Sequence, residues 1–168
     1  MSERKVLNRE LEIFTDGACS GNPGYAAVAV IIREGGKVIK EMALGIGQST
    51  NNVAEYTAII YALQEALILK ADKVSLFTDS ELVYKQFTGT YDVKDVKMKV
   101  LFDQVQHLKN GFKVFEIKHI PREQNKDADR LAKKAILASK KSMGGSQFAS
   151  VCRNILCCVK KCREIFIV

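Results

Sequence analysis

Three β-strand patterns in immediate succession limit the fold of this chain more than any other feature of its sequence. Residues 10–18, 26–33 and 38–46 are rich in apolar and β-branched side chains, which are typical of strands. The connections Gly21-Asn22-Pro23-Gly24 and Glu34-Gly35-Gly36 carry strong turn signals. Because such short connections join antiparallel neighbours, the sequence predicts an antiparallel meander of three strands.

Helix and strand patterns alternate over the rest of the chain. Apolar side chains at helical spacing predict helices at residues 53–70, 81–87, 93–109 and 127–139. Short apolar runs predict two further strands, at residues 74–77 and 112–117. Strands separated by a helix need a crossover connection and therefore pair in parallel. The predicted fold class is α/β, with helices flanking a five-stranded mixed sheet in which strands 1–3 are antiparallel and strands 4 and 5 run parallel to strand 1.

Two of the predicted helices carry local details that a structure can test. Asn52 is expected to cap the helix of residues 53–70, because Asn side chains accept hydrogen bonds from the free amides of a first helical turn. In the helix of residues 93–109, the side chains expected to face inward are Val96, Val100, Leu101, Val105 and Leu108.

Charge and cysteine content divide the chain into two parts. The net charge is +7, but residues 139–168 hold six basic side chains and one acidic side chain, so most of the excess lies in the tail. Four of the five cysteines also lie in the tail, and Cys19 is alone in the part before it, which fits a reducing compartment. We therefore predict one domain over residues 1–141 and a basic, cysteine-containing extension of unknown role over residues 142–168.

No targeting or membrane segment is expected. The start of the chain, Met1-Ser2-Glu3-Arg4-Lys5, lacks the apolar run of a signal peptide. The longest helical apolar stretch, residues 53–69, contains Glu55, Gln64 and Glu65, which are incompatible with a membrane span. The sequence therefore predicts a monomeric, cytoplasmic protein without a membrane partner.

Two segments share a sequence pattern that indicates a functional site. Ile13-Phe14-Thr15-Asp16 and Leu76-Phe77-Thr78-Asp79 are each an apolar strand that ends in Thr-Asp. The ends of buried strands are where α/β sheets place their sites. A single Thr-Asp pair is more simply explained as a cap of the following turn or helix. Two buried carboxylates from neighbouring strands favour a shared cation, because an uncompensated buried carboxylate is costly.

Glu55 and Asp129 each have a structural explanation when taken alone. Glu55 would complete a capping box with Asn52, and Asp129 would be a favourable negative charge at the positive end of the last helix. Together with Asp16 and Asp79, however, they form an oxygen-only set of ligands, which suits Mg²⁺ or Mn²⁺ rather than zinc. Two such ions about 4 Å apart can activate a water molecule and stabilise the leaving oxygen of a phosphodiester. The four acids therefore predict a two-metal nuclease.

Four sequence blocks in this order resemble type 1 ribonuclease H, over roughly residues 8–140. The blocks are Thr15-Asp16-Gly17-Ala18-Cys19-Ser20-Gly21-Asn22-Pro23-Gly24, Thr50-Asn51-Asn52-Val53-Ala54-Glu55, Phe77-Thr78-Asp79-Ser80, and His119-Ile120-Pro121-Arg122-Glu123-Gln124-Asn125-Lys126-Asp127-Ala128-Asp129-Arg130-Leu131-Ala132. The resemblance implies a ribonuclease H-like fold and an endonuclease that hydrolyses the RNA strand of RNA–DNA hybrids, leaving 5′-phosphate and 3′-hydroxyl ends.

The resemblance also implies roles for individual residues. Asp16, Glu55, Asp79 and Asp129 match the acids that hold two Mg²⁺ ions, for which Mn²⁺ can substitute, and Asp16 would be the ligand shared by both ions. His119 matches a mobile histidine that assists proton transfer or product release, a task suited to a group that titrates near neutral pH. Five further positions match residues that contact the hybrid, whose shallow minor groove exposes 2′-hydroxyls; they are Cys19, Asn22, Thr50, Asn51 and Asn52.

The chain departs from the longer members of this family in two respects. Residues 88–111 leave no room for their basic protrusion, so the chain looks like the shorter, archaeal-like form, some members of which also cut double-stranded RNA. The spacing of Cys152, Cys157, Cys158 and Cys162 is not a usual zinc spacing. An appended packing segment or a weakly ordered segment is favoured for the tail, with a docking helix, a disulfide hook and a basic hybrid-binding arm as alternatives.

Two other functions compete with a hybrid-cutting ribonuclease. One is a non-catalytic module that binds RNA–DNA hybrids, against which the intact set of four acids and His119 argue. The other is a ribonuclease H domain of a reverse-transcriptase-like element, against which the start at Met1 and the closed domain argue.

Overall fold

The computed structural model of the chain describes residues 8–142. The observed order of elements is that predicted from the sequence. The first four strands are longer than predicted, the fifth is shifted by two residues, and one turn of 3₁₀ helix, η1, is added. The elements are β1 (Glu10–Gly21), β2 (Gly24–Glu34), β3 (Lys37–Ser49), α1 (Asn51–Ile68), β4 (Lys73–Thr78), α2 (Glu81–Phe87), α3 (Val96–Lys109), β5 (Val114–His119), η1 (Arg122–Gln124) and α4 (Lys126–Ser142).

The five strands form one mixed sheet in the order β3-β2-β1-β4-β5. The strands β1, β2 and β3 are antiparallel neighbours, whereas β4 pairs in parallel with β1 and β5 pairs in parallel with β4. This arrangement confirms the predicted fold class. It also makes β1 the central strand, so that a side chain on β1 can meet groups from both halves of the sheet.

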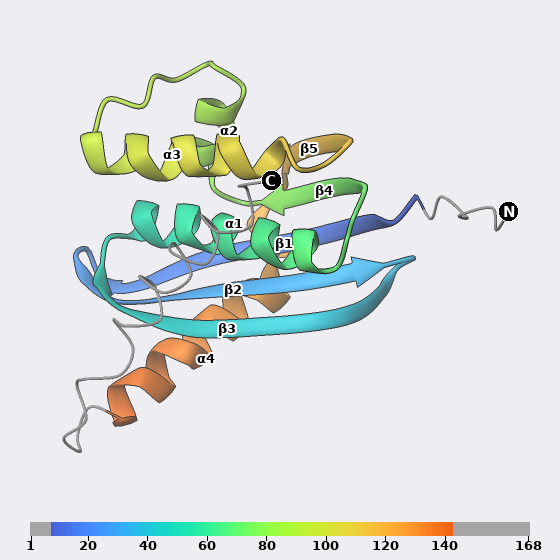
Figure 1. Cartoon of the computed structure of the whole chain (residues 1–168). Helices are drawn as coiled ribbons and strands as arrows, with labels where there is room; N and C mark the ends of the chain where they lie inside the picture. Colours follow the sequence, from blue (N-terminus) through green and yellow to red (C-terminus); the bar gives the residue numbers. More distant parts are fainter. Residues whose placement is uncertain (1–7, 143–168) are drawn as a thin grey trace, which may run out of the picture.

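Helices cover both faces of the sheet (Figure 1). On one face, α1 packs on β1 and β2 and α3 packs on α1, which together enclose the main hydrophobic core around Ile13, Tyr56 and Leu63. On the other face, α4 crosses β1, β2 and β3 and buries Ala128 and Ala132 against Ala29 and Ile31. The two helical layers therefore approach β1 from opposite sides.

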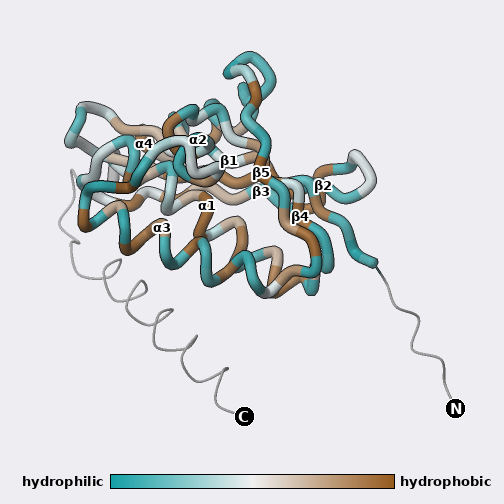
Figure 2. The backbone as a smooth tube through the Cα atoms, turned by 90° about the horizontal axis from the view of Figure 1, so that it is seen from above, coloured by the Kyte–Doolittle hydropathy of each residue, from teal (hydrophilic) through white to brown (hydrophobic). Residues whose placement is uncertain are grey.

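The outermost helix of the thicker layer, α3, alternates hydrophobic and hydrophilic turns along its length (Figure 2). Its buried side chains are Met98 and Val105, while Val96 and Val100 are 79% and 62% exposed. The predicted inward position of Val96 and Val100 is therefore wrong. The helix begins only at Val96, capped by Asp95, whose side chain accepts a hydrogen bond from Met98 N. The side chains that this helix buries in the main core are Met98 and Val105.

The start of α1 also differs from the prediction. Its N-cap is Thr50, whose hydroxyl accepts a hydrogen bond from Val53 N at 3.4 Å, so the predicted cap at Asn52 is wrong. The reason is that β3 runs to Ser49, and the helix follows after a single residue. Asn51 and Asn52 consequently lie inside the first turn of α1, with exposed side chains.

A glycine permits the close contact between α1 and β1. A Cβ atom added to Gly17 would collide with the backbone of Ala54 and Glu55. Any larger residue at this position would therefore push the first turn of α1 away from the central strand. Gly17 is in this way responsible for bringing Glu55 next to Asp16.

None of the helices in residues 8–142 combines the length and the apolar character that a membrane span requires. The predicted extension of residues 142–168, with its four cysteines, lies almost entirely outside the described residues. The boundary between the domain and the extension stays a prediction.

Candidate active site

Asp16 and Asp79 come together because their strands are parallel neighbours. The pairing of β1 with β4 ends at Thr15 and Thr78, which lie opposite each other, and the two aspartates follow directly. Contrary to the sequence prediction, Asp16 does not stand at a strand end, since β1 continues to Gly21 with β2 alone as its partner. Asp16 instead marks the point at which β4 leaves the sheet, which opens space beside the central strand.

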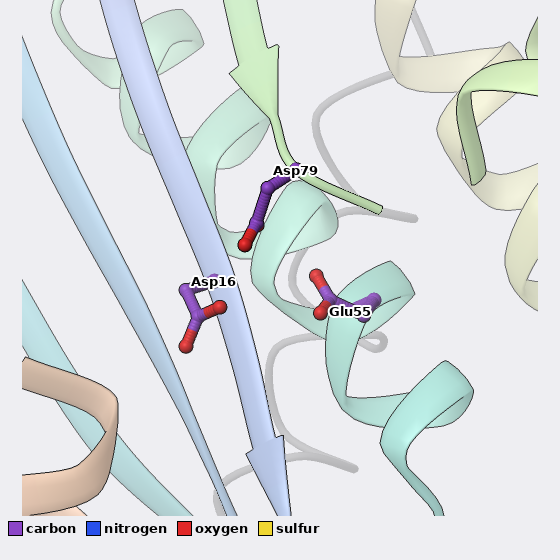
Figure 3. Close-up of side chains that lie close together, drawn as sticks. All are labelled: Asp16, Glu55 and Asp79. Carbon is purple, nitrogen blue, oxygen red and sulfur yellow. The ribbon is translucent and has the colours of Figure 1, made fainter. Parts of the chain in front are cut away.

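Glu55 joins the two aspartates from the first turns of α1. Ligand oxygens of Asp16, Glu55 and Asp79 all lie within 4.8 Å of one another. Figure 3 shows the three carboxylates pointing into one space, from β1, from α1 and from the loop after β4. Asp16 and Glu55 are each only 5% exposed, and Asp79 is half-buried. We call these three residues the acid cluster.

Burial and the repulsion between neighbouring carboxylates dominate the electrostatics of the acid cluster. Burial, reinforced by the negative charges of Asp79 and Asp129, raises the pKa of Asp16 to about 7. Burial and the neighbouring Asp16 and Asp79 hold the pKa of Glu55 well above its usual range, although a hydrogen bond from the backbone of Gly17 opposes this shift.

Two oxygens of the acid cluster have no hydrogen-bond partner among the described residues, namely Asp16 Oδ2 and Glu55 Oε2. Buried carboxylate oxygens without donors are costly, and a cation is the group that would satisfy them. Oxygen-only donors at this separation fit a divalent cation of the Mg²⁺ or Mn²⁺ type. The residues present therefore suit a divalent metal ion.

Asp129 is a fourth acid in the same cleft, but it stands apart from the acid cluster. It lies on α4, where Arg122 Nη2 contacts its Oδ1 at 2.8 Å and Lys133 Nζ contacts its Oδ2 at 2.7 Å. Burial opposes the ionised form, but the hydrogen bonds from Lys133 and Arg122 outweigh it and lower the pKa of Asp129 below its ordinary value. Its charge therefore already has partners within the protein.

The acid cluster and Asp129 line one open cleft of about 530 Å³. From the acids the cleft extends along one side of α4, where it is lined by Lys133, Leu137 and Lys140, and toward the end of β1 at Cys19 and Ser20. The cleft is therefore acidic at one end and basic at the other, which suits a substrate that carries several phosphates.

His119 is not part of this cleft. It is exposed at the end of β5, directly opposite Thr78 in the parallel register, and its ring centre lies 5.8 Å from that of Tyr84. The register places His119 one strand away from the segment that carries Asp79, on the rim of the site rather than inside it.

The five residues predicted to contact a hybrid gather around the start of α1 and the turn between β1 and β2. Asn22 Oδ1 accepts a hydrogen bond from Asn51 N at 3.2 Å, and the thiol of Cys19 donates to Ser49 O at 3.1 Å. Cys19 and Asn51 line the cleft. Thr50 caps α1, and Asn52 is exposed in its first turn. The turn and the helix start thus form one polar surface beside the acids.

Sequence reasoning missed Asn125, which contacts the acid cluster directly. This residue lies between η1 and α4, and its amide donates to Asp79 Oδ1 at 2.9 Å. An Asn just before a helix reads as an ordinary cap, so the local sequence gave no sign of this contact. Arg122 and Lys133, the partners of Asp129, were also not predicted, although the four-residue spacing from Asp129 to Lys133 on one helix was a usable signal.

A five-stranded mixed sheet that gathers acids beside its central strand defines a class of α/β protein with an acidic site that could hold a metal ion. A family model described as reverse transcriptase-like matches residues 14–135. Ribonuclease HI of Halobacterium salinarum is 41% identical over 124 residues, covering 73% of this chain, and the chain spans 62% of that relative's length. Ribonuclease H of Rhizobium etli is 36% identical over 148 residues, covering 79% of this chain and 95% of the relative.

Solved structures agree with these relatives. The crystal structure of LC11-RNase H1 in complex with RNA/DNA hybrid matches with a TM-score of 0.72 at 38% sequence identity, covering 77% of this chain and 98% of the other. The chain belongs to the ribonuclease H family.

Proposed function

We propose that this chain is an endoribonuclease that hydrolyses the RNA strand of RNA–DNA hybrids with the help of divalent cations. The acid cluster is the observation that carries this proposal. Three carboxylates converge there, and two of them have buried oxygens without a partner among the described residues, an arrangement that a neutral core would make unnecessary. The substrate class is supported by family membership and by the related LC11-RNase H1 structure, which was solved in complex with RNA/DNA hybrid.

The proposal includes two Mg²⁺ ions, with Mn²⁺ as a substitute, held by Asp16, Glu55, Asp79 and Asp129. Ions bound there would supply an activated water and neutralise charge on the phosphodiester, so that cleavage leaves 5′-phosphate and 3′-hydroxyl ends. Asp16 lies beside Glu55 and Asp79 and is also influenced by the charge of Asp129, which is what a ligand shared by both ions requires. Asp129 must release at least part of its contact with Arg122 and Lys133 to take part.

His119 is proposed to assist proton transfer or product release from the rim of the site. Its exposed position at the end of β5, next to the β4 segment that leads into Asp79, allows its side chain to move between solvent and substrate. An imidazole can both donate and accept a proton, which suits it to that task.

Recognition of the hybrid is proposed to use the polar surface around the start of α1. Short amide, hydroxyl and thiol groups can approach 2′-hydroxyls in a wide minor groove, where long charged side chains cannot fit as closely. The hydrogen bond between Asn22 and the backbone of Asn51 fixes the turn against the helix, so this surface is organised before substrate arrives.

A cleavage assay on three duplexes of one sequence tests the proposal. Labelled RNA–DNA, RNA–RNA and DNA–DNA duplexes are incubated with Mg²⁺, with Mn²⁺ and with EDTA. We expect cutting of the RNA strand of the hybrid with either ion and none with EDTA. Hybrid binding without cutting under all conditions would instead identify a non-catalytic binding module, and equal cutting of RNA–RNA would extend the substrate class to double-stranded RNA.

A further inference from the structure

One buried residue, Asn125, contacts three of the four segments that carry the acids. Asn125 is 1% exposed, and its Nδ2 donates to Thr15 O at 2.9 Å and to Asp79 Oδ1 at 2.9 Å. Its own backbone oxygen accepts a hydrogen bond from Asp129 N at 3.1 Å. A single residue thus touches the strand position before Asp16, the carboxylate of Asp79 and the backbone of Asp129.

The usual role of an Asn in front of a helix does not explain these contacts. A capping Asn uses its side-chain oxygen to accept hydrogen bonds from the first amides of the helix. Here Asn125 Oδ1 has no partner among the described residues, although it is buried, and both amide contacts are made with groups before α4 in the sequence. The side chain is therefore directed into the site and not toward the helix that it precedes.

The chemistry of the contact suits a group that orients a metal ligand. The Asn amide is neutral and has two hydrogens, and both are used, one on the β1 backbone and one on the carboxylate. A neutral donor fixes the direction of a carboxylate without adding a positive charge that would compete with a cation, in contrast to the Lys and Arg side chains on Asp129. One oxygen of Asp79 is held, and Oδ2 remains available for a cation.

We propose that Asn125 is a positioning residue that sets the orientation of Asp79 for divalent-cation binding. This inference rests on the proposed function, since it takes the acid cluster to be the metal site. Asn125 itself contacts neither substrate nor cation in this role. It acts through Asp79, and its loss weakens the binding of the cation before it affects the binding of the hybrid.

The test compares Asn125→Ala with Gln86→Ala. Gln86 is also a buried amide, hydrogen-bonded to the hydroxyl of Tyr56 in the helical layer away from the cleft, so its loss reports the general cost of removing a buried amide. Mn²⁺ binding is measured by calorimetry without substrate, alongside the Mg²⁺ dependence of cleavage, the KM for the hybrid and the thermal midpoint. We expect Asn125→Ala to weaken Mn²⁺ binding about 10- to 100-fold with KM changed less than about twofold. Gln86→Ala is expected to lower the thermal midpoint alone.

A double-mutant cycle identifies the partner through which Asn125 acts. In an Asp79→Asn background, Asn125→Ala should cause no further loss of Mn²⁺ affinity, because the carboxylate that it orients is gone. Asn125→Ser retains one donor and is expected to give an intermediate affinity, and it replaces the Ala variant if that variant does not fold. Unchanged Mn²⁺ affinity in Asn125→Ala, or in Asn125→Ser if the Ala variant does not fold, would overturn the inference. Failure of the proposed function is separate from this result, since it would appear as absence of hybrid cleavage by the unmodified protein that binds Mn²⁺.

Discussion

The acid cluster and Asp129 line the same cleft but are stabilised in opposite ways. Asp16 and Glu55 are buried, have raised pKa values and keep oxygens without partners among the described residues. Asp129 lies at the edge of the cleft, has a lowered pKa and is contacted by Arg122 and Lys133. Asp16 and Glu55 are therefore harder to ionise than ordinary carboxyl groups, whereas Asp129 is easier to ionise.

Under the proposed function, this difference separates the part of the site that needs a cation from the part that does not. Bringing buried carboxylates together raises the free energy of their ionised forms, and a divalent cation reverses that effect when it binds. Asp129 needs no such help to ionise, because the protein supplies its counter-charges. If the proposed metal site is correct, cation binding and proton release are coupled at the acid cluster, and Asp129 must first exchange partners to act as a ligand.

The largest effect is expected from Asp16→Asn, which removes the central charge of the acid cluster while keeping the side chain's shape. We expect hybrid cleavage to fall by about a thousandfold or more, since a metal ion contributes several kcal/mol to charge stabilisation and about 1.4 kcal/mol is a factor of ten in rate. The matched control is Asp103→Asn, which removes an exposed acid that pairs with Lys99 on α3. Retained activity in Asp16→Asn, measured with saturating Mg²⁺, would show that the acid cluster is not the metal site.

The next largest effect is expected on the free energy of unfolding, which should depend on pH when metal is removed. The pKa of Asp16 is raised to about 7 in the folded protein, so the folded state holds a proton that the unfolded chain releases near pH 4. Without metal, the contribution of Asp16 to the free energy of unfolding should therefore be highest below about pH 4. It should fall between about pH 4 and pH 7 and stay constant above pH 7. Each pKa unit corresponds to about 1.4 kcal/mol, so the loss amounts to a few kcal/mol.

Adding Mg²⁺ should restore that stability, and it should do so most strongly at pH 7 and above, where the carboxylates are free to bind it. Thermal midpoints measured in EDTA and in Mg²⁺ across this pH range check the prediction. In Asp16→Asn, the decline in EDTA should become clearly shallower. A stabilisation by Mg²⁺ that is the same at pH 5 and pH 8 would contradict the proposed coupling.

The comparison also shows which parts of the site the sequence could predict. The strand order follows from short turns and crossovers, so the convergence of Asp16 with Asp79 was accessible from the pattern alone. To place Glu55 in the site, the exact start of α1 must be known. There the segment Thr50-Asn51-Asn52 offers three residues, each of which can cap a helix. Only the end of β3 at Ser49, a tertiary feature, selects Thr50.

Other parts depend on contacts between distant segments. Asn125 donates to Thr15 and Asp79, which are 110 and 46 residues away in the sequence, and no local pattern reports such contacts. The exposed Val96 and Val100 were misplaced for a related reason, because a short amphipathic helix allows more than one choice of inward face and its contact with α1 decides between them.

Two lysines seven residues apart on α4 have different partners at the two ends of the cleft. Lys133 contacts the carboxylate of Asp129, whereas Lys140 Nζ donates to the neutral hydroxyl of Ser20 at 2.7 Å. The charge of Lys140 is therefore available for a phosphate. We expect Lys140→Ala to raise the KM for the hybrid about threefold at moderate salt and to lower the salt slope of binding by about one, with kcat unchanged.

Lys99→Ala is the control for Lys140→Ala, because Lys99 is an exposed lysine on α3 at the other face of the sheet and pairs with Asp103. Binding of labelled hybrid at several salt concentrations, in Ca²⁺ to prevent turnover, measures the slope. An unchanged slope for Lys140→Ala would place the phosphates of the substrate away from this end of the cleft.

The smallest effect is expected from Lys133→Ala, and it should run in the opposite direction. Lys133 competes with a cation for Asp129, and an exposed ion pair four residues apart on a helix contributes only about 0.3–0.5 kcal/mol. Its removal should therefore lower the Mg²⁺ concentration for half-maximal cleavage by about twofold at saturating hybrid. Lys134→Ala, on the same helix and also exposed, is the control and should change nothing. If Lys133→Ala instead needs more Mg²⁺, then Lys133 holds Asp129 in the position that the cation requires. In that case Lys133 would orient Asp129 for the cation in the same way as Asn125 is proposed to orient Asp79.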